Sequence, residues 1–194
     1  MVTNLSRRGE ESKQAILDAT RELIAARGVG SLTVEAVAAR AGVAKTTIYR
    51  RWRDKWELAL DAVMIDLLPA FYPPPADVGD TRKELIAFTD SVVKSLGSLP
   101  SGPAMQGLVS RIATDPQLMQ VYRHYVVDPR RAQLKEVIER GVARGDLRPD
   151  TRIEVLHEFL LGPIFYRLLL SGDRLDRKLS ARLVDSILAG FAPR

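Results

Sequence analysis

Apolar residues recur every three or four positions along almost all of this 194-residue chain, which is the spacing of one face of an α-helix. No stretch alternates apolar and polar residues between hairpin turns, as paired β-strands would. The chain is therefore expected to be all-α. The periodicity predicts helices over 12–27, 34–41, 45–52, 54–71, 81–96, 103–114, 116–144, 151–170 and 177–191. At Asp128-Pro129 the long helix is expected either to kink or to restart.

The composition excludes several classes of protein. Cysteine is absent, so the chain can form no disulfide, no zinc–thiolate site and no thiol nucleophile. Residues 1–14 are mostly polar and charged, unlike a secretory signal. The longest strongly apolar stretch, 159–170, is interrupted by Gly162, Pro163 and Arg167 and is too short to span a membrane. A cytoplasmic protein with no membrane partner is expected.

Positive charge is concentrated near the start of the chain. Residues 1–58 hold eleven Lys/Arg against seven Asp/Glu, whereas residues 59–194 hold eighteen against seventeen. Most of the net charge of +5 thus lies in the first third of the chain. Such an asymmetry favours an N-terminal region that binds a polyanion.

Two short helices joined by a glycine turn form the most informative segment. The first carries small alanines that allow close packing, Gly42 supplies the positive φ of a tight turn, and the second covers 45–52. Ile48 and Trp52 stand four residues apart and should pack inward. The opposite face would then carry side chains suited to phosphates and base edges: Lys45, Thr46, Tyr49, Arg50 and Arg53.

A basic helix face that is merely solvated is the alternative. Lys55 favours the nucleic-acid interpretation, because it occupies the first position of the next helix, where the helix dipole disfavours a cation. A phosphate bound at that helix end would explain the lysine. Asp54 and Glu57 resemble a capping box for the same helix.

This segment closely resembles the DNA-binding domain of the tetracycline-repressor (TetR) family of bacterial regulators. The resemblance covers about residues 12–60 and rests on Leu32-Thr33, Ala41-Gly42-Val43, Thr47-Ile48-Tyr49, and Trp52 followed by Asp54-Lys55. It implies a three-helix helix-turn-helix domain over residues 1–55 and a larger helical domain over 56–194 that binds an effector and dimerises through the last two helices. It also implies a transcriptional repressor, not an enzyme, which has no cofactor and leaves its DNA operator when a small molecule binds.

The resemblance assigns roles by position. Thr33, Thr47, Tyr49 and Lys55 would hold phosphates, and Lys45, Thr46 and Arg50 would face base edges. Arg51 would serve either role. The family often has an aromatic or histidine at positions 50 and 51 and Phe at 52, where this chain has Arg50, Arg51 and Trp52. The additional arginines favour guanine contacts or stronger phosphate binding.

Residues 59–194 carry no recognisable catalytic or metal-binding motif. His124 and His157 lie on different helices without a carboxylate or cysteine at ligand spacing, so no metal site is expected. A pocket between helices for a small-molecule effector is predicted, although an ordinary hydrophobic core explains its residues equally well. The candidate lining residues are Met64, Phe71, Phe88, Met105, Leu108, Arg111, Met119 and Tyr122.

The last two helices predict a homodimer. The helix over 151–170 is apolar on several sides, which its own domain cannot cover completely. Gly162 would allow close approach of a second backbone, and the segment 162–170 resembles the dimer-forming helix of one TetR subgroup. The expected interface residues are Leu161, Gly162, Phe165, Leu168, Leu169, Leu183 and Ile187. Two other functions stay open: a non-specific architectural DNA-binding protein, and a small-molecule-binding protein or enzyme without a DNA role.

Overall fold

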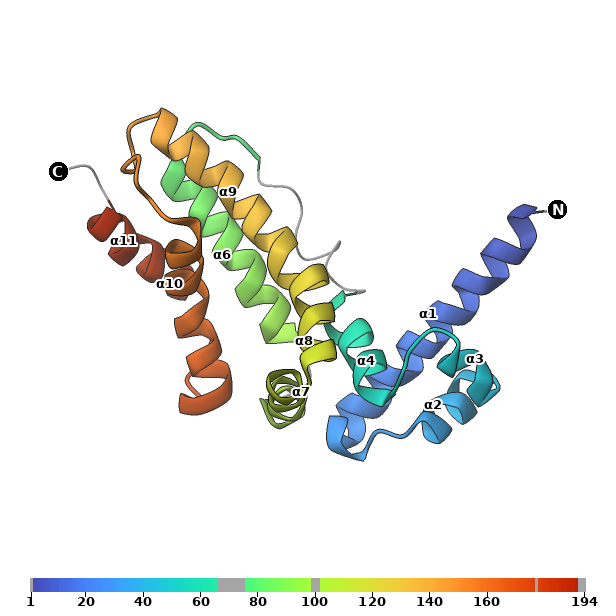
Figure 1. Ribbon diagram of the computed structural model, residues 1–194. Helices are drawn as coiled ribbons and strands as arrows, with labels where there is room; N and C mark the ends of the chain where they lie inside the picture. The colour runs from blue at the N-terminus through green and yellow to red at the C-terminus, as the bar shows by residue number, and fades with distance from the viewer. Residues whose placement is uncertain (1, 66–75, 99–101, 177, 192–194) are drawn as a thin grey trace. The chain divides into compact units, whose positions relative to one another are not determined.

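The computed structural model describes residues 2–65, 76–98, 102–176 and 178–191. Every regular element within these ranges is helical, as the sequence predicts (Figure 1). The elements are α1 (Val2–Arg27), the 3₁₀ turn η1 (Val29–Ser31), α2 (Val34–Ala41), α3 (Lys45–Tyr49), α4 (Lys55–Leu60), η2 (Asp61–Ile65), α6 (Thr81–Ser98), α7 (Gly102–Thr114), α8 (Pro116–Tyr122), η3 (Arg123–Val127), α9 (Asp128–Ala143), α10 (Ile153–Tyr166), η4 (Arg167–Ser171) and α11 (Leu179–Phe191). The segments η2, η3 and η4 are π-helical.

Apart from shifts of one or two residues, two helix bounds differ from the expected ones. Helix α1 begins at Val2 rather than near residue 12, because residues 2–11 are mostly polar and give no periodic signal although they are helical. Helix α3 ends at Tyr49, and the next turn is held by hydrogen bonds from the Arg51 and Trp52 amides to the Ile48 carbonyl. Of the helix expected over 54–71, residues 66–71 lie outside the described residues.

The chain divides into two compact units that are not continuous in sequence. The N-terminal unit comprises Met1–Leu67 and Pro100–Tyr122, and the C-terminal unit comprises Leu68–Leu99 and Arg123–Arg194. These units differ from the division expected at residue 55, because α4, α7 and α8 pack together with the first three helices. The division by function, with DNA binding in 1–55 and effector binding and dimerisation in 56–194, stays a prediction.

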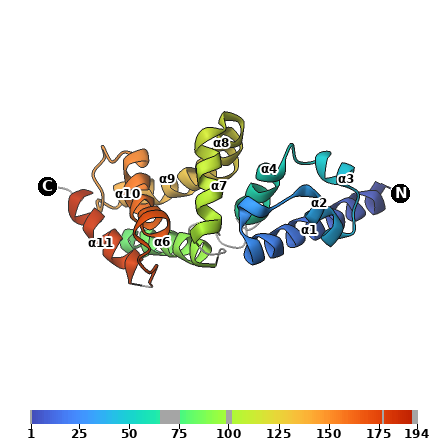
Figure 2. The same cartoon turned by 90° about the horizontal axis from the view of Figure 1, so that it is seen from below.

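The N-terminal unit is built around α1. Helix α2 packs against α1 and α3 packs against α2, and the three lie close together when seen from below (Figure 2). Thr33 caps α2 by accepting a hydrogen bond from the Ala36 amide at 3.2 Å. Gly42 ends α2 in the left-handed conformation, with φ 66°, which confirms the predicted glycine turn.

Helix α7 closes the apolar core of this unit from the other end. It packs on η1 and α4, while α8 packs on α4, and their residues Leu108, Ile112 and Leu118 are buried. The approach to η1 requires a glycine at position 107. A Cβ atom there would lie 2.8 Å from Cγ1 of Val29, closer than real Cβ contacts allow.

The C-terminal unit is a layer of packed helices in which α6 lies beside α9 and α11, and α10 contacts α6, α9 and α11 (Figure 1). The long helix neither stops nor breaks at Pro129. Proline lacks an amide hydrogen, and its ring crowds the carbonyl four residues earlier. The π-helical turn η3, which contains that residue, Tyr125, widens the helix there and lets it continue into α9.

A buried carboxylate joins α6 to α9 inside the C-terminal unit. The Glu84 side chain is fully buried and accepts hydrogen bonds from Nη2 of Arg144 at 3.0 Å and Nε of Arg140 at 2.9 Å. Arg144 also donates to the hydroxyl of Thr81 at 3.0 Å. Two guanidinium groups therefore supply hydrogen bonds and positive charge to one carboxylate. These interactions compensate for the removal of the carboxylate from water.

Replacing Glu84 should destabilise the protein. Glu84→Gln keeps the volume but leaves Arg140 and Arg144 without their buried counter-charge, so the free energy of unfolding should fall by about 2–3 kcal/mol. Chemical denaturation at fixed protein concentration measures this loss. Glu136→Gln, at an exposed position on α9, is the control and should change stability little. Equal stability of the two variants would contradict a structural role for the Glu84 carboxylate.

Candidate nucleic-acid interface

Helix α3 and the turn that follows it are anchored by two buried side chains. Ile48 and Trp52 are buried, at 1% and 4% exposure, which confirms the predicted inward face. The indole Nε1 of Trp52 donates to Oδ2 of Asp61 at 2.9 Å. A buried indole N–H needs such an acceptor. This contact fixes the end of α3 against η2.

The outer face of α3 presents polar groups to solvent. Tyr49 is 53% exposed, unusually for a large aromatic residue. Within the described ranges, no side-chain hydrogen bond or ion pair engages four of the predicted contact residues: Thr46, Thr47, Tyr49 and Arg50. Their hydrogen-bonding groups are therefore available to a ligand.

Lys45, at the start of α3, has a partner within the unit. Its Nζ lies 3.2 Å from Oε1 of Glu35 on α2, and both side chains are more than half exposed. A hydrogen bond from its own backbone amide, followed by the contact with Lys45, lowers the pKa of Glu35. The ion pair links the two helices of the helix-turn-helix, and exposed pairs of this kind are readily exchanged for other partners.

Two further predicted contact residues make internal hydrogen bonds. Lys55 donates to the carbonyl of Gly30 at 2.9 Å and lies 4.8 Å from the centre of the Trp56 ring. Arg51 donates to the carbonyl of Gly9 on α1 at 2.8 Å. These contacts provide a structural reason for a lysine at the first position of α4, which the sequence alone suggests only for phosphate binding.

The start of α4 is capped as the sequence predicts. Oδ1 of Asp54 accepts hydrogen bonds from the amides of Trp56 at 2.9 Å and Glu57 at 3.0 Å. Glu57 in turn accepts from the amide of Arg53 at 2.9 Å. The turn between α3 and α4 is therefore fixed by side chains on both sides of it.

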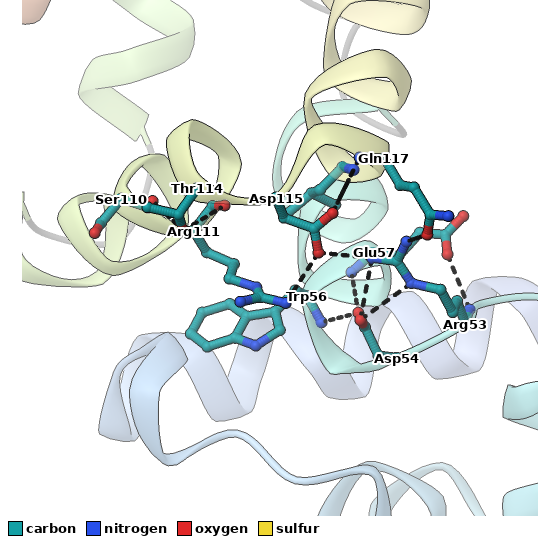
Figure 3. A network of polar contacts seen from close by, with 10 residues as sticks. Arg53, Asp54, Trp56, Glu57, Ser110, Arg111, Thr114, Asp115 and Gln117 are labelled. Carbon is teal, nitrogen blue, oxygen red and sulfur yellow. Dashed lines mark hydrogen bonds and ion pairs between the residues drawn. The ribbon is translucent and has the colours of Figure 1, made fainter.

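Arg53 connects this turn to the corner between α7 and α8 (Figure 3). Its Nη2 lies 3.0 Å from Oδ2 of Asp115, and its Nη1 donates to the side-chain oxygen of Gln117. Arg111 approaches the same carboxylate oxygen at 2.9 Å. One aspartate thus holds two arginines, one from the helix-turn-helix and one from α7.

The other oxygen of Asp115 caps α8. Oδ1 accepts from the amides of Gln117 and Leu118, both at 3.1 Å, and Pro116 between them and the cap occupies the first helical position. The hydrogen bond from the Leu118 amide is the main cause that lowers the pKa of Asp115, and the charges of Arg53 and Arg111 add to it. The carboxylate is therefore ionised at neutral pH and serves both contacts at once.

The sequence did not indicate Glu35, Asp115 or Gln117 as part of this region. The Asp115-Pro116 pair marks a helix start, but nothing local shows that its carboxylate reaches Arg53, 62 residues away. The sequence placed Arg53 on the solvent face of the recognition helix, whereas the structure ties its guanidinium group to the same unit.

The predicted effector residues do not all belong to one compact unit. Phe88 is buried in the core of the C-terminal unit. Leu108 is buried in the N-terminal unit, where Arg111 is paired with Asp115, and Met119 and Tyr122 are half-buried. The side chains of Met64, Phe71 and Met105 lie outside the described part of the chain. A pocket formed by these residues stays a prediction.

The predicted dimer residues differ in exposure. Leu161 and Ile187 are buried in the core of their own unit, which leaves little of either side chain for a partner. Phe165, Leu168, Leu169 and Leu183 are half-buried, and Gly162 is exposed with open space where a Cβ would be. Large apolar side chains that are more exposed lie on the same helix and its π-helical extension: Phe159, Tyr166 and Leu170.

The described ranges show neither a metal-binding cluster nor a membrane-spanning helix. No group of three or more His, Asp or Glu side chains there is placed to hold a metal ion. None of the helices in these ranges combines the length and the apolar character needed to cross a lipid bilayer.

Comparison with known proteins matches both parts of the chain to one family. Residues 16–62 match the family of bacterial regulatory proteins called tetR, and residues 75–187 match a tetracyclin repressor-like C-terminal domain. The HTH-type transcriptional regulator YdeS of Bacillus subtilis is 32% identical over 183 residues, which cover 94% of this chain and 91% of YdeS.

Another relative and one solved structure show similar agreement. A DNA-binding transcriptional repressor, TetR of Mycobacteroides abscessus, is 31% identical over 185 residues, covering 93% of this chain and 94% of that protein. The crystal structure of the TetR family transcription regulator SCO0332 superimposes with a TM-score of 0.74 at 32% identity. That match covers 94% of this chain and all of the other.

The contact between Arg53 and Asp115 can be tested by a double-mutant cycle. Asp115→Asn keeps an oxygen to cap α8 but removes the charge, and Arg53→Gln removes the other charge. Each change should lower the melting temperature, and the double variant should lose less than the two losses added together. Arg53→Gln combined with Glu136→Gln, which has no contact with it, should be additive. Additive losses for both pairs would mean that the ion pair has no energetic role.

Proposed function

This chain belongs to the TetR family of helix-turn-helix transcriptional regulators, a family without enzymatic activity, and we propose that it is a repressor released from its operator by a small molecule. The observation that carries the proposal is the polar outer face of α3, held rigidly by Ile48 and Trp52 and open to solvent at Tyr49 and Arg50. Similarity to a protein named as a transcriptional repressor supports repression rather than activation.

The outer face of α3 supplies the base-reading residues. Arg50 has a free guanidinium group, which can donate two parallel hydrogen bonds to O6 and N7 of a guanine in the major groove. Thr46 stands on the same face. Lys45 reaches a base edge by leaving Glu35, an exchange that their exposed ion pair permits.

Phosphate contacts surround this face. Thr47 and Tyr49 on α3 offer hydroxyl groups, and the Thr33 hydroxyl at the start of α2 keeps its hydrogen for donation while its oxygen caps the helix. Lys55 has two ammonium hydrogens besides the one bound to Gly30. Arg51 is assigned to a phosphate rather than a base, because its bond to Gly9 holds it near α1.

The operator-bound form is a homodimer joined through α10 and α11. Phe159, Gly162, Tyr166 and Leu170 follow one another at helical spacing and expose an apolar surface, with Leu170 78% exposed. Covering it with a second copy would remove this surface from water. A two-fold dimer would place two recognition helices in successive major grooves about 34 Å apart.

The effector is proposed to bind within the region that matches the C-terminal domain, residues 75–187. It would act by population shift, binding more tightly to a dimer whose recognition helices no longer fit the two half-sites. Only a difference in affinity between the two forms can release the operator.

Footprinting on the DNA upstream of the protein's own gene, with random DNA as competitor, tests the specificity. Arg50→Ala should weaken operator binding about 10–100-fold and relax the preference at the base pair it reads. Tyr49→Phe should weaken binding to all sequences by about 3–10-fold, as expected for one phosphate contact. Arg27→Ala, at an exposed position at the end of α1, is the matched control. Equal competition by random DNA would support a non-specific architectural protein instead.

The dimer is tested at the most exposed apolar position. Leu170→Glu places a charge at the most exposed residue of the proposed interface and should yield monomers at micromolar concentration in sedimentation experiments, with loss of operator binding. Val78→Glu, at an exposed aliphatic residue of the same unit, should remain dimeric. Dimers of unchanged stability in Leu170→Glu would exclude this surface as the interface.

A further inference from the structure

Glu35 is an acidic residue in an otherwise basic part of the helix-turn-helix. Residues 33–53 contain five Lys/Arg, and Glu35 is the single acidic residue among them. It lies on α2, where Val34, Val37 and Ala38 are buried, whereas the Glu35 side chain is 62% exposed. DNA phosphates repel a carboxylate on a surface that approaches them, so this position of an acid requires an explanation.

The carboxylate of Glu35 contacts the start of the recognition helix. Nζ of Lys45 donates to Oε1 of Glu35 at 3.2 Å. The helix dipole favours an acid in the first turn of α2, but it does not account for this contact with α3. Because the pKa of Glu35 is lowered, first by its own backbone amide and then by Lys45, the group is ionised at neutral pH. Glu35 can therefore only accept hydrogen bonds, and Lys45 can only donate them.

When Lys45 leaves for a base, the carboxylate of Glu35 loses its counter-charge. Close to DNA, this unpaired carboxylate lowers the affinity unless another donor replaces the lysine. The donors that face the major groove are N4 of cytosine and N6 of adenine. Lysine favours guanine, which offers it the acceptors O6 and N7, and the base paired with guanine is cytosine. The replacement donor therefore belongs to the same base pair.

The spacing of the ion pair matches that of a G·C base pair. N4 of cytosine donates to O6 of guanine, so these two atoms lie about 2.9 Å apart. Nζ of Lys45 and Oε1 of Glu35 lie 3.2 Å apart. The two side chains can thus exchange their mutual hydrogen bond for bonds to the two bases while staying close together. An A·T pair also has a donor beside an acceptor, but it offers the ammonium group one acceptor instead of two.

We propose that Glu35 is a specificity-determining residue, which accepts a hydrogen bond from N4 of a cytosine whose paired guanine is bound by Lys45. The assignment rests on the proposed function, since it names the base pair that one part of the same DNA-binding surface reads. At any other base pair Lys45 loses an acceptor, or Glu35 loses its donor and faces the DNA unpaired. The carboxylate therefore weakens binding to the wrong sequences.

Two modified bases test the two contacts separately. The probe is the DNA segment protected in the footprint upstream of the protein's own gene, with each G·C pair modified in turn and binding measured by fluorescence anisotropy. N4-methylcytosine still pairs with guanine but replaces the N4 hydrogen that faces the major groove. At one G·C pair in each half-site it should weaken binding about 5–20-fold. 7-Deazaguanine lacks N7 and should weaken binding at the same pair about 3–10-fold, because Lys45 keeps only O6.

Glu35→Ala should bind cytosine and N4-methylcytosine at this pair equally well and remain sensitive to 7-deazaguanine. The remaining sensitivity would show that the variant is folded and that Lys45 still reaches its base. Glu22→Ala is the matched control, because Glu22 is a similarly exposed carboxylate that forms an ion pair with Arg40 of α2. This variant should keep the parent's sensitivity to both modified bases.

Three results would overturn the inference while a specific footprint leaves the repressor standing. The parent could be insensitive to N4-methylcytosine at every pair, or Glu35→Ala could be as sensitive to it as the parent. Glu35→Ala could also lose its sensitivity to both modified bases, which would mean that Glu35 only positions Lys45. If the parent protects no specific segment, the proposed function is wrong and the role of Glu35 falls with it.

Discussion

The Asp115 carboxylate determines how the helix-turn-helix is held in the N-terminal unit. One oxygen caps α8, and the other holds Arg53 from the α3–α4 turn and Arg111 from α7. Only an ionised carboxylate can accept all of these donors, and the Leu118 amide together with the two arginines keeps it ionised. Since Ile48 and Trp52 are buried against the same unit, α3 has a defined position on a scaffold that includes residues far along the chain.

Positive charge in the first 58 residues serves two purposes. Some basic groups are used internally: Arg53 in the ion pair with Asp115, Arg51 and Lys55 on backbone carbonyls, and Lys45 on Glu35. Arg50 remains for an external ligand. The net positive charge therefore overstates the number of side chains available to DNA. Hydrogen bonds and ion pairs within the unit compete with contacts to DNA for the same lysine and arginine side chains.

The sequence predicted best those features that depend on neighbours in the chain. Helical periodicity, the left-handed turn at Gly42, the Asp54 cap and the buried pair Ile48 and Trp52 are local, and each was found as expected. The start of α1 was missed because its polar residues carry no periodic pattern. The partner of Arg53 was missed because the sequence does not show which distant carboxylate the fold brings next to an arginine. Burial of His157 beside two arginines depends on the packing of α9 on α10, which no single helix reveals.

The discontinuity of the N-terminal unit has a consequence for biosynthesis. Its core includes Leu108 and Leu118, which follow the helix-turn-helix by more than forty residues and are separated from it by α6 of the other unit. During translation the first four helices therefore leave the ribosome before the helices that cover their apolar side have been made. Domains generally fold as units as they emerge. This one can complete its core only after residue 122 has been synthesised, so the apolar side of its first four helices stays uncovered during part of synthesis.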